Sequence, residues 1–199
     1  MFDRSLFVRG LPMAALGVLL AGPVVAQTTS YTPVDIRPYL AVGLTGGGDE
    51  IATFDFTDGS SDTVNAGELV EFRAGLHWRI SEMFSLRGSL GYHVASSTAS
   101  NGSFRFERFP VELIGLIQAS QRLRVGLGVR KATSARTRSS GAAAGLNADF
   151  TATTGAVGEL EYFFSPNYSL YGRFVAEKYT SQNIRYNGNH VGVGVNFYF

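Results

Sequence analysis

The chain has 199 residues, no cysteine, 24 glycines and 13% aromatic residues, and its formal net charge is +1. The lack of cysteine excludes disulfides, thiol catalysis and cysteine-ligated metals, and the small net charge argues against a nucleic-acid partner held by bulk electrostatics. Charged residues make up 17%, below the roughly 25% of soluble domains, but the mean hydropathy of +0.06 is too low for a bundle of membrane helices.

Residues 1–26 predict a cleaved secretory signal peptide. Arg4 and Arg9 form a basic start, an apolar run follows at 11–20, and small residues precede a cleavage point after Ala26. An uncleaved membrane anchor is the alternative, but the apolar run is shorter than the roughly 20 residues that a spanning helix needs. We therefore expect cleavage and export.

After a short N-terminal lead at 27–35, apolar residues alternate with polar or small residues in one segment after another. In the second segment, Phe72 and Trp78 fall on one face while Glu71 and His77 fall on the other. A period of two over such lengths is typical of β-strands. The pattern predicts eight strands, at 37–45, 68–80, 84–95, 108–118, 122–131, 154–163, 168–179 and 190–199.

The connections between these segments alternate in length. Three tight turns are predicted at 81–83, 119–121 and 165–167. The other stretches are longer and polar, and are expected to be loops near 46–66, 96–103, 131–149 and 180–188. Short turns at one end and long loops at the other are typical of an outer-membrane barrel whose short turns face the periplasm.

The polar face of the alternating segments favours a membrane barrel over a soluble sandwich. This face carries arginine, glutamate, glycine, serine and tyrosine with little lysine, which suits a narrow lumen filled by side chains. Aromatic residues gather near the short turns, among them Trp78, Phe84, Tyr162 and Tyr168, and predict an interfacial girdle. A soluble lipocalin-like barrel is the structural alternative and would need an apolar interior. We predict an all-β fold: an eight-stranded antiparallel up-and-down transmembrane β-barrel at 36–199.

With these features, the chain resembles the small eight-stranded outer-membrane β-barrel families, meaning the OmpA-type transmembrane domain and its single-domain relatives. The final "VGVGVNFYF" is similar to the C-terminal assembly signal of these families, here carried by Val195, Phe197 and Phe199. The resemblance implies export through the periplasm, recognition by the barrel-assembly machinery and a place in the cell outer membrane. The peptidoglycan-binding domain that often follows an OmpA-type barrel is not expected here.

Charged residues on the lumen face are the main candidate site. Pairing across the turn at 81–83 would place Glu71 opposite His93 and His77 opposite Arg87. The same reasoning places Glu112 diagonally near Arg130 and lets Glu159 reach Arg173. The expected network consists of Glu71, Arg73, His77, Arg87, His93, Arg108, Glu112, Arg124, Arg130, Glu159, Arg173 and Glu177. Paired charges that plug the barrel are favoured over a gate or a small-ion path, because side chains fill the interior of eight strands.

Catalysis is not expected. A lipid A-modifying enzyme would need a histidine, serine and acid set on the lipid face. The three histidines, His77, His93 and His190, are all predicted to face the lumen. Neither a catalytic residue nor a cofactor is therefore assigned.

The predicted loops carry charges of both signs. The first loop holds acidic residues, for which a solvated loop is favoured over weak divalent binding: Asp49, Glu50, Asp55, Asp58 and Asp62. No metal site is assigned. Four basic residues lie near the third loop: Arg130, Lys131, Arg136 and Arg138. They could contact lipopolysaccharide phosphates; the alternative is a solvated loop or pairing with the acidic first loop.

The sequence favours a structural or surface-interaction role, with a plugged lumen. The expected partners are outer-membrane lipids and lipopolysaccharide, the barrel-assembly machinery during biogenesis, and an extracellular ligand bound through the loops, with no nucleic acid. A narrow porin-like passage for small solutes or ions is the second hypothesis. A lipid A-modifying enzyme is the third.

Overall fold

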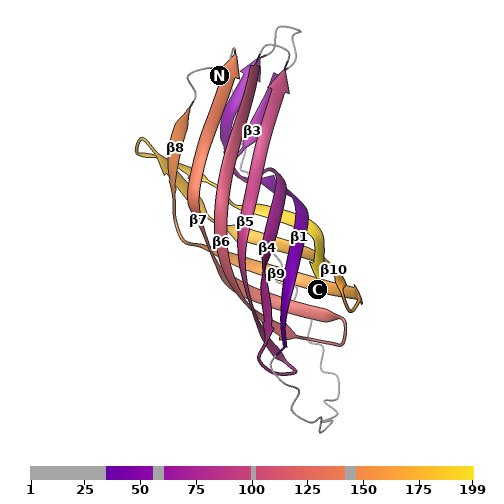
Figure 1. Cartoon of the computed structure of the whole chain (residues 1–199). Helices are drawn as coiled ribbons and strands as arrows, with labels where there is room; N and C mark the ends of the chain where they lie inside the picture. The colour runs from indigo at the N-terminus through magenta and orange to yellow at the C-terminus, as the bar shows by residue number, and fades with distance from the viewer. Residues whose placement is uncertain (1–34, 56–60, 100–101, 142–146) are drawn as a thin grey trace, which may run out of the picture. The chain divides into compact units, whose positions relative to one another are not determined.

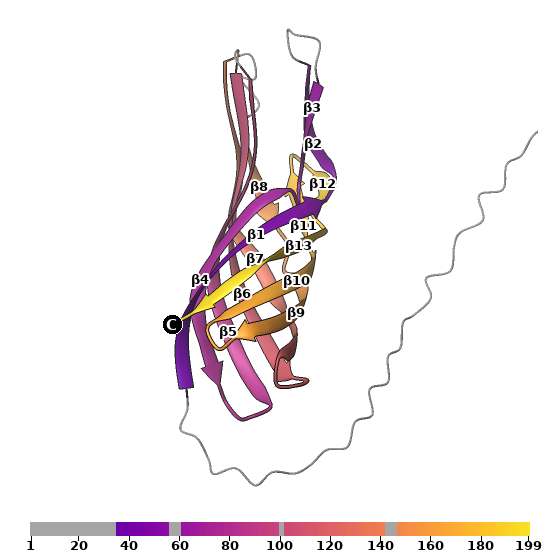
Figure 2. The same ribbon diagram turned by 90° about the vertical axis from the view of Figure 1, so that its right-hand side faces the viewer.

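The computed structural model describes residues 35–55, 61–99, 102–141 and 147–199 (Figures 1 and 2). The expected signal peptide and nearly all of the expected lead lie outside the described residues. Within the described ranges, no helix is long and apolar enough to cross a membrane. The strands are β1 (Asp35–Gly47), β2 (Glu50–Asp55), β3 (Ser61–Asn65), β4 (Leu69–Arg79), β5 (Phe84–Ala99), β6 (Gly102–Gln118), β7 (Leu123–Gly141), β8 (Ala148–Ala152), β9 (Gly155–Ser165), β10 (Tyr168–Ala176), β11 (Lys178–Ser181), β12 (Ile184–Asn187) and β13 (His190–Tyr198).

Eight of these strands close into an antiparallel barrel. Around the wall the order is β1-β4-β5-β6-β7-β9-β10-β13, and β13 pairs back with β1. The closing seam runs from Tyr39 opposite Tyr198 to Gly47 opposite His190, and Figure 2 shows β13 between β1 and β10. Closure removes the unpaired strand edges that lipid cannot hydrate. The predicted fold class is confirmed.

The two faces of the wall are reversed relative to a soluble protein. Leu90 and Leu127 are 67% and 75% exposed on the outside, whereas Glu71 and Arg108 are 0% exposed on the inside. An apolar exterior over a charged interior suits a wall that is solvated by lipid. The polar interior also excludes the lipocalin-like alternative.

One apolar cluster interrupts the charged interior. Ile114, which breaks the polar face of its predicted strand, is buried inside the barrel with Leu116, Val157 and Val175. These four side chains come from β6, β9 and β10. The break in the pattern therefore marks a patch of apolar packing within the lumen rather than a break in the strand.

The four long polar stretches contain strands, so their prediction as loops was wrong. β2 and β3 form a hairpin, β5 and β6 pair as far as Ala99 and Gly102, and β7 continues to Gly141. β8 pairs with β7, and β11 pairs with β12. Figures 1 and 2 show these extensions rising from the end of the barrel opposite the tight turns, here called the hairpin end. A hairpin in water can be polar on both faces while its backbone stays paired, so it lacks the alternation of a lipid-facing wall.

The extensions enclose a small apolar core at the hairpin end. Phe106 is fully buried there, with its ring 5.2 Å from that of Phe150 and 5.7 Å from that of Tyr179. The buried members come from β3, β5, β6, β7, β8 and β11 and the turn after β3: Val64, Ala66, Ala95, Phe104, Phe106, Ala132, Ala135, Ala152 and Tyr179. This apolar core closes the hairpin end of the barrel and lies next to the charged interior.

Two glycines at the closing seam should be essential for packing. Gly43 lies opposite Gly194, and a Cβ at either position would overlap the Tyr171 hydroxyl inside the lumen. We expect Gly194→Val to lower the free energy of unfolding by about 1–3 kcal/mol through overpacking, measured by urea unfolding in phospholipid vesicles. Gly172→Val is the matched control, since a Cβ there meets nothing within 4 Å. Equal losses in the two variants would contradict this packing role.

Candidate functional site

Among the residues that the structure describes, as many carboxylates as guanidinium groups are fully buried in the barrel interior. Among the described residues it buries five carboxylates and five guanidinium groups, each less than 5% exposed: Glu71, Glu112, Glu159, Glu161 and Glu177, with Arg73, Arg87, Arg108, Arg130 and Arg173. An unpaired charge in such a place would be very costly, so each group requires a partner. The contacts below show how the strands supply those partners.

Two arginines and two glutamates form the centre of this network. Arg173 donates from Nη1 to Glu71 Oε2 over 2.9 Å and from Nη2 to Glu112 Oε1 over 2.7 Å. Arg130 donates to Glu112 Oε1 over 2.9 Å and also to Glu71. Each carboxylate therefore binds both arginines. Because the four residues belong to β4, β6, β7 and β10, the group ties distant parts of the wall together.

A second group lies toward the tight turns. Arg87 on β5 pairs with Glu159 and, over 3.4 Å, with Glu161, both of which lie on β9. Glu161 Oε1 also accepts hydrogen bonds from Asn196 Nδ2 over 2.7 Å and from the Tyr198 hydroxyl over 2.6 Å. This carboxylate is fully buried and fully engaged.

Arg73 connects the two groups. Its Nη1 lies 3.3 Å from Glu159 Oε2 and 3.6 Å from Glu112 Oε2, and its Nε lies 3.7 Å from Glu71 Oε2. Its guanidinium carbon also lies 4.6 Å from the ring centre of Tyr171. The ionic contacts thus run without interruption along the lumen.

Toward the hairpin end the network meets the apolar core. Arg130 Nε donates to Glu177 Oε2 over 3.1 Å, and the Tyr179 hydroxyl donates to Glu177 Oε1 over 2.6 Å. Arg108 donates to the backbone carbonyl of Ala66, and its guanidinium carbon lies 4.9 Å from the ring centre of Phe106. Charged and aromatic groups therefore meet directly at this level.

His93 joins the network as a neutral bridge between two strands. Its Nδ1 lies 3.2 Å from Arg130 Nη2, and its Nε2 lies 2.8 Å from Thr45 Oγ1. A guanidinium group can only donate, so Nδ1 accepts and Nε2 is the ring nitrogen that donates to Thr45. His93 therefore extends the contacts of β7 to β1.

The structure supports most of the predicted pairs. Glu71 lies opposite His93, and His77 lies opposite Arg87, as predicted. The diagonal placement of Glu112 and Arg130 was wrong. They lie directly opposite, because the turn after β6 pairs Gln118 with Arg124 and so fixes the register.

The predicted contact between Glu159 and Arg173 is replaced by contacts across the lumen. The two residues are cross-strand neighbours on β9 and β10. Arg173 nevertheless reaches Glu71 and Glu112, and Glu159 binds Arg73 instead. Sequence pairing rules address adjacent strands only, so they miss partners that meet across a narrow lumen.

Eleven of the twelve predicted network residues are buried inside the barrel, and Arg124 is half-buried. Arg124 lies near the tight turns, with its guanidinium carbon 4.3 Å from the ring centre of Phe163. Glu161, Asn196 and Tyr198 are members that the prediction omitted. The signal for Glu161 was present, because it follows Glu159 by two residues and so shares its face.

Sequence comparison agrees with this architecture. Residues 14–199 match the outer membrane protein beta-barrel domain family. The chain belongs to this family. It is therefore an outer-membrane β-barrel protein, as its inverted faces also indicate. A comparison with curated protein sequences gave no match.

One of the solved structures that resemble this chain shares its fold. Neisserial surface protein A is 16% identical, with a TM-score of 0.50, and the match covers 84% of this chain and all of that one. Ail, the attachment invasion locus protein of Yersinia pestis, was solved with the heparin analogue sucrose octasulfate. It is 11% identical with a TM-score of 0.47, and the match covers 82% of this chain and 97% of that one.

The shared carboxylates predict strong energetic coupling across the lumen. Glu71→Gln should lower the free energy of unfolding by about 3–5 kcal/mol, because it leaves two buried guanidinium groups with one fewer carboxylate. Arg173→Met should cost a similar amount, and the double variant should cost clearly less than the sum of the two. The measurement is urea unfolding in vesicles, followed by the fluorescence of the single tryptophan, Trp78.

The control for this cycle is Arg185→Gln, at an exposed position on β12. Its effect should stay within about 0.5 kcal/mol. Strictly additive losses for Glu71 and Arg173 would show that the two side chains do not interact in the folded barrel.

Proposed function

We propose that this protein is a closed outer-membrane barrel with a structural or surface-interaction role. The observation that carries the proposal is the pairing of Arg173 with both Glu71 and Glu112. Around the wall, β10 is separated from β4 by β13 and β1, and from β6 by β9 and β7. The ion pairs therefore cross the lumen rather than follow its wall, and a solute moving along the axis would have to separate them.

Packing at both ends supports a closed lumen. The apolar core with Phe106 covers the charges at the hairpin end. Near the tight turns, the rings of Tyr39 and Tyr198 stack at 5.8 Å, and both side chains are almost fully buried. A path for ions would have to cross these apolar and aromatic layers as well as the salt bridges.

The hairpins support the surface-interaction part of the proposal. Outer-membrane barrels place their tight turns in the periplasm and their longer connections outside the cell. By this rule, the extended parts of β5, β6 and β7 stand outside the membrane and are available to an extracellular ligand. The outer face of the barrel contacts outer-membrane lipids, and lipopolysaccharide is the proposed lipid partner on the extracellular side.

A narrow passage for small solutes or ions is the second candidate. The observation that favours it is a surface cavity of about 570 Å³ beside the tight turns, lined in part by Arg79, Arg122 and Arg124. A basic mouth of this kind would attract anions. A lipid A-modifying enzyme is less well supported, since His77 and His93 are buried inside the barrel and do not face lipid.

Conductance in planar lipid bilayers tests the closed-lumen proposal. The purified protein is expected to give no resolvable single-channel events, because side chains fill the interior. A variant with Glu71→Ala, Arg130→Ala and Arg173→Ala, if it folds, should conduct more than the wild-type chain. Steady conductance by the wild-type protein would favour the narrow passage instead.

We also propose that Val195, Phe197 and Phe199 serve as the assembly signal. Phe199 is 68% exposed, and its N–H donates to the Pro38 carbonyl over 3.0 Å. The Phe197 ring lies edge-on to Tyr168 at 5.6 Å. The end of the chain therefore presents the exposed Phe199 ring beside the half-buried Phe197 ring at the tight-turn end, where assembly factors in the periplasm can reach Phe199.

Phe199→Lys is expected to reduce insertion into the outer membrane severalfold, measured as the folded, heat-modifiable fraction in isolated membranes. Phe164→Lys is the matched control, since Phe164 is also exposed near a tight turn at 58%. It should have the smaller effect. Equal losses in the two variants would assign the defect to the aromatic girdle and would refute a special role for Phe199.

A further inference from the structure

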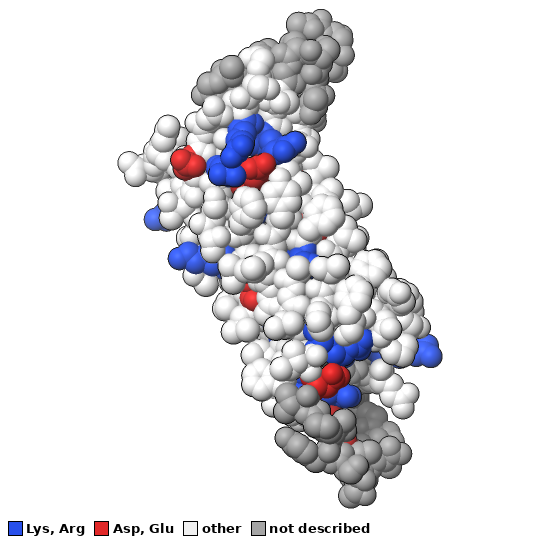
Figure 3. Space-filling model, viewed as in Figure 1, with Lys and Arg blue, Asp and Glu red and all other residues white. Residues whose placement is uncertain are grey.

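Three arginines surround one glutamate on the outer face of β6 and β7. Arg105, Glu107, Arg136 and Arg138 are here called the arginine patch. Glu107 lies opposite Arg136, and Arg105 lies directly opposite Arg138. Figure 3 shows basic side chains gathered around an acidic one over the upper parts of these strands. Like charges directly opposite each other in a sheet are unfavourable, so this arrangement calls for an anion nearby.

The patch lies just above the lipid-facing zone. Toward the hairpin end, the outer face changes from apolar to polar on both strands. On β6 Glu107 comes after Phe109, and on the antiparallel β5 Ser96 comes after Val94. The Tyr92 ring packs on Phe109 at 5.2 Å, and its hydroxyl donates to Glu107 Oε1 over 3.2 Å. Tyrosine with an apolar ring and a hydrated hydroxyl is typical of a membrane interface. The patch is therefore at the height of the lipid headgroups.

The single glutamate does not neutralise the three arginines. Glu107 lies 3.3 Å from Arg136, 3.5 Å from Arg105 and 3.7 Å from Arg138. Burial raises the pKa of Glu107, but hydrogen bonds from Arg136 and Tyr92 outweigh it and hold that pKa below its usual range. The carboxylate is thus ionised at neutral pH. Even with Asp149, which lies opposite Arg136 on β8, the described charges here remain net positive.

The guanidinium groups also adjoin a pocket lined with hydroxyl groups. A pocket of about 180 Å³ on this face is lined by Ser96, Ser103, Ser140, Arg105 and Arg138, together with the glutamate. Ser103 Oγ lies 2.9 Å from Ser140 Oγ at its upper edge. Guanidinium and hydroxyl donors around one small space suit the oxygens of a phosphate group.

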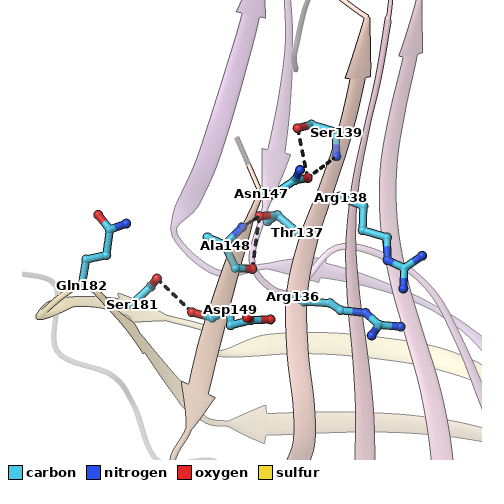
Figure 4. Close-up of a pocket in the computed structure, with 9 residues that line it drawn as sticks. All are labelled: Arg136, Thr137, Arg138, Ser139, Asn147, Ala148, Asp149, Ser181 and Gln182. Carbon is cyan, nitrogen blue, oxygen red and sulfur yellow. Dashed lines mark hydrogen bonds between the residues drawn. The ribbon is translucent and has the colours of Figure 1, made fainter. Parts of the chain in front are cut away.

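Arg136 and Arg138 line one edge of a neighbouring groove, but their guanidinium groups extend away from it, toward this face. Figure 4 shows a groove of about 690 Å³ between β7, β8 and the β11–β12 hairpin. Thr137 and Ser139 point toward Asn147 and Ala148 there, and hydrogen bond with them. Arg136 and Arg138 extend the other way, toward β6 and β5. Their charges are therefore presented on the outer surface of the barrel.

We propose that the arginine patch binds the phosphate group of a glycolipid in the outer leaflet, of the lipid A class. Arginine matches phosphate oxygens with paired donors, and the apolar wall below would hold the acyl chains. This inference rests on the lipid partner proposed above and names its binding site. It is independent of the closed lumen, which conductance tests separately.

The test is titration of lipid A into the folded, full chain in a neutral detergent, with the dissociation constant as readout. The variant Arg105→Gln with Arg138→Gln should bind at least about tenfold more weakly, since two charged hydrogen-bond donors are lost. Arg185→Gln, which changes an exposed arginine elsewhere, should bind like the wild-type chain. Glu107→Gln should keep or increase the affinity, because it removes the carboxylate that competes with phosphate.

Two further ligands separate the sources of phosphate. Lipid A without its phosphates should bind the wild-type chain at least about tenfold more weakly, by the same loss of charged hydrogen bonds. Inorganic phosphate should bind far more weakly than lipid A, because it lacks the acyl chains. If it binds equally well, the patch is a site for soluble anions and the lipid assignment is overturned.

The proposal is overturned if the double arginine variant binds lipid A as tightly as the wild-type chain. It is also overturned if Glu107→Gln loses affinity tenfold, because the carboxylate would then be the recognising group. Heat-modifiable migration confirms that each variant is folded. Should the double variant not fold, Arg138→Gln alone replaces it, with an expected loss of about threefold, and unchanged affinity in that variant overturns the proposal equally.

Discussion

The sharing of Glu71 and Glu112 by Arg130 and Arg173 is the interaction on which the structure depends. Four buried charges in a lumen this narrow are tolerable only because each meets two of the opposite sign. The lipid-facing side supplies little drive for closure, since apolar side chains gain nothing by leaving lipid for one another. Specific contacts inside the barrel therefore help to determine which strands face each other across the axis.

The need to pair buried charges accounts for three layers along the barrel axis, a charged centre and an apolar or aromatic layer at each end. The charged centre is enclosed by the stacked tyrosines Tyr39 and Tyr198 at the tight-turn end and by the apolar core around Phe106 at the hairpin end. Both layers lower the access of water to the ion pairs, and low access strengthens each pair. The outer surface has the opposite arrangement, with apolar side chains at the level of the membrane and charged side chains beyond it. The arginine patch lies where the outer surface passes from lipid to water.

Much of the barrel wall was predictable, because the alternation of apolar and polar residues along a strand indicates which face each residue occupies. The sequence placed Glu71 and His93 opposite each other correctly, since a tight turn fixes the register of the strands that it joins. Ile114 shows the limit of this reasoning, because an apolar residue on the polar face of a strand marks an apolar part of the lumen. The strands of the hairpins were not predicted, because strands with water on both faces need not alternate apolar and polar residues.

The contacts of Arg173 could not have been predicted from its own strand or from its neighbours. Its partners lie on β4 and β6, and their position depends on the closure of the whole barrel. Solid-state NMR of the protein in a lipid bilayer can detect them directly, through dipolar couplings between the guanidinium nitrogens of Arg173 and the carboxyl carbons of Glu71 and Glu112. A closed lumen predicts strong couplings to both carboxyl carbons. Their absence in the folded barrel would contradict the central claim.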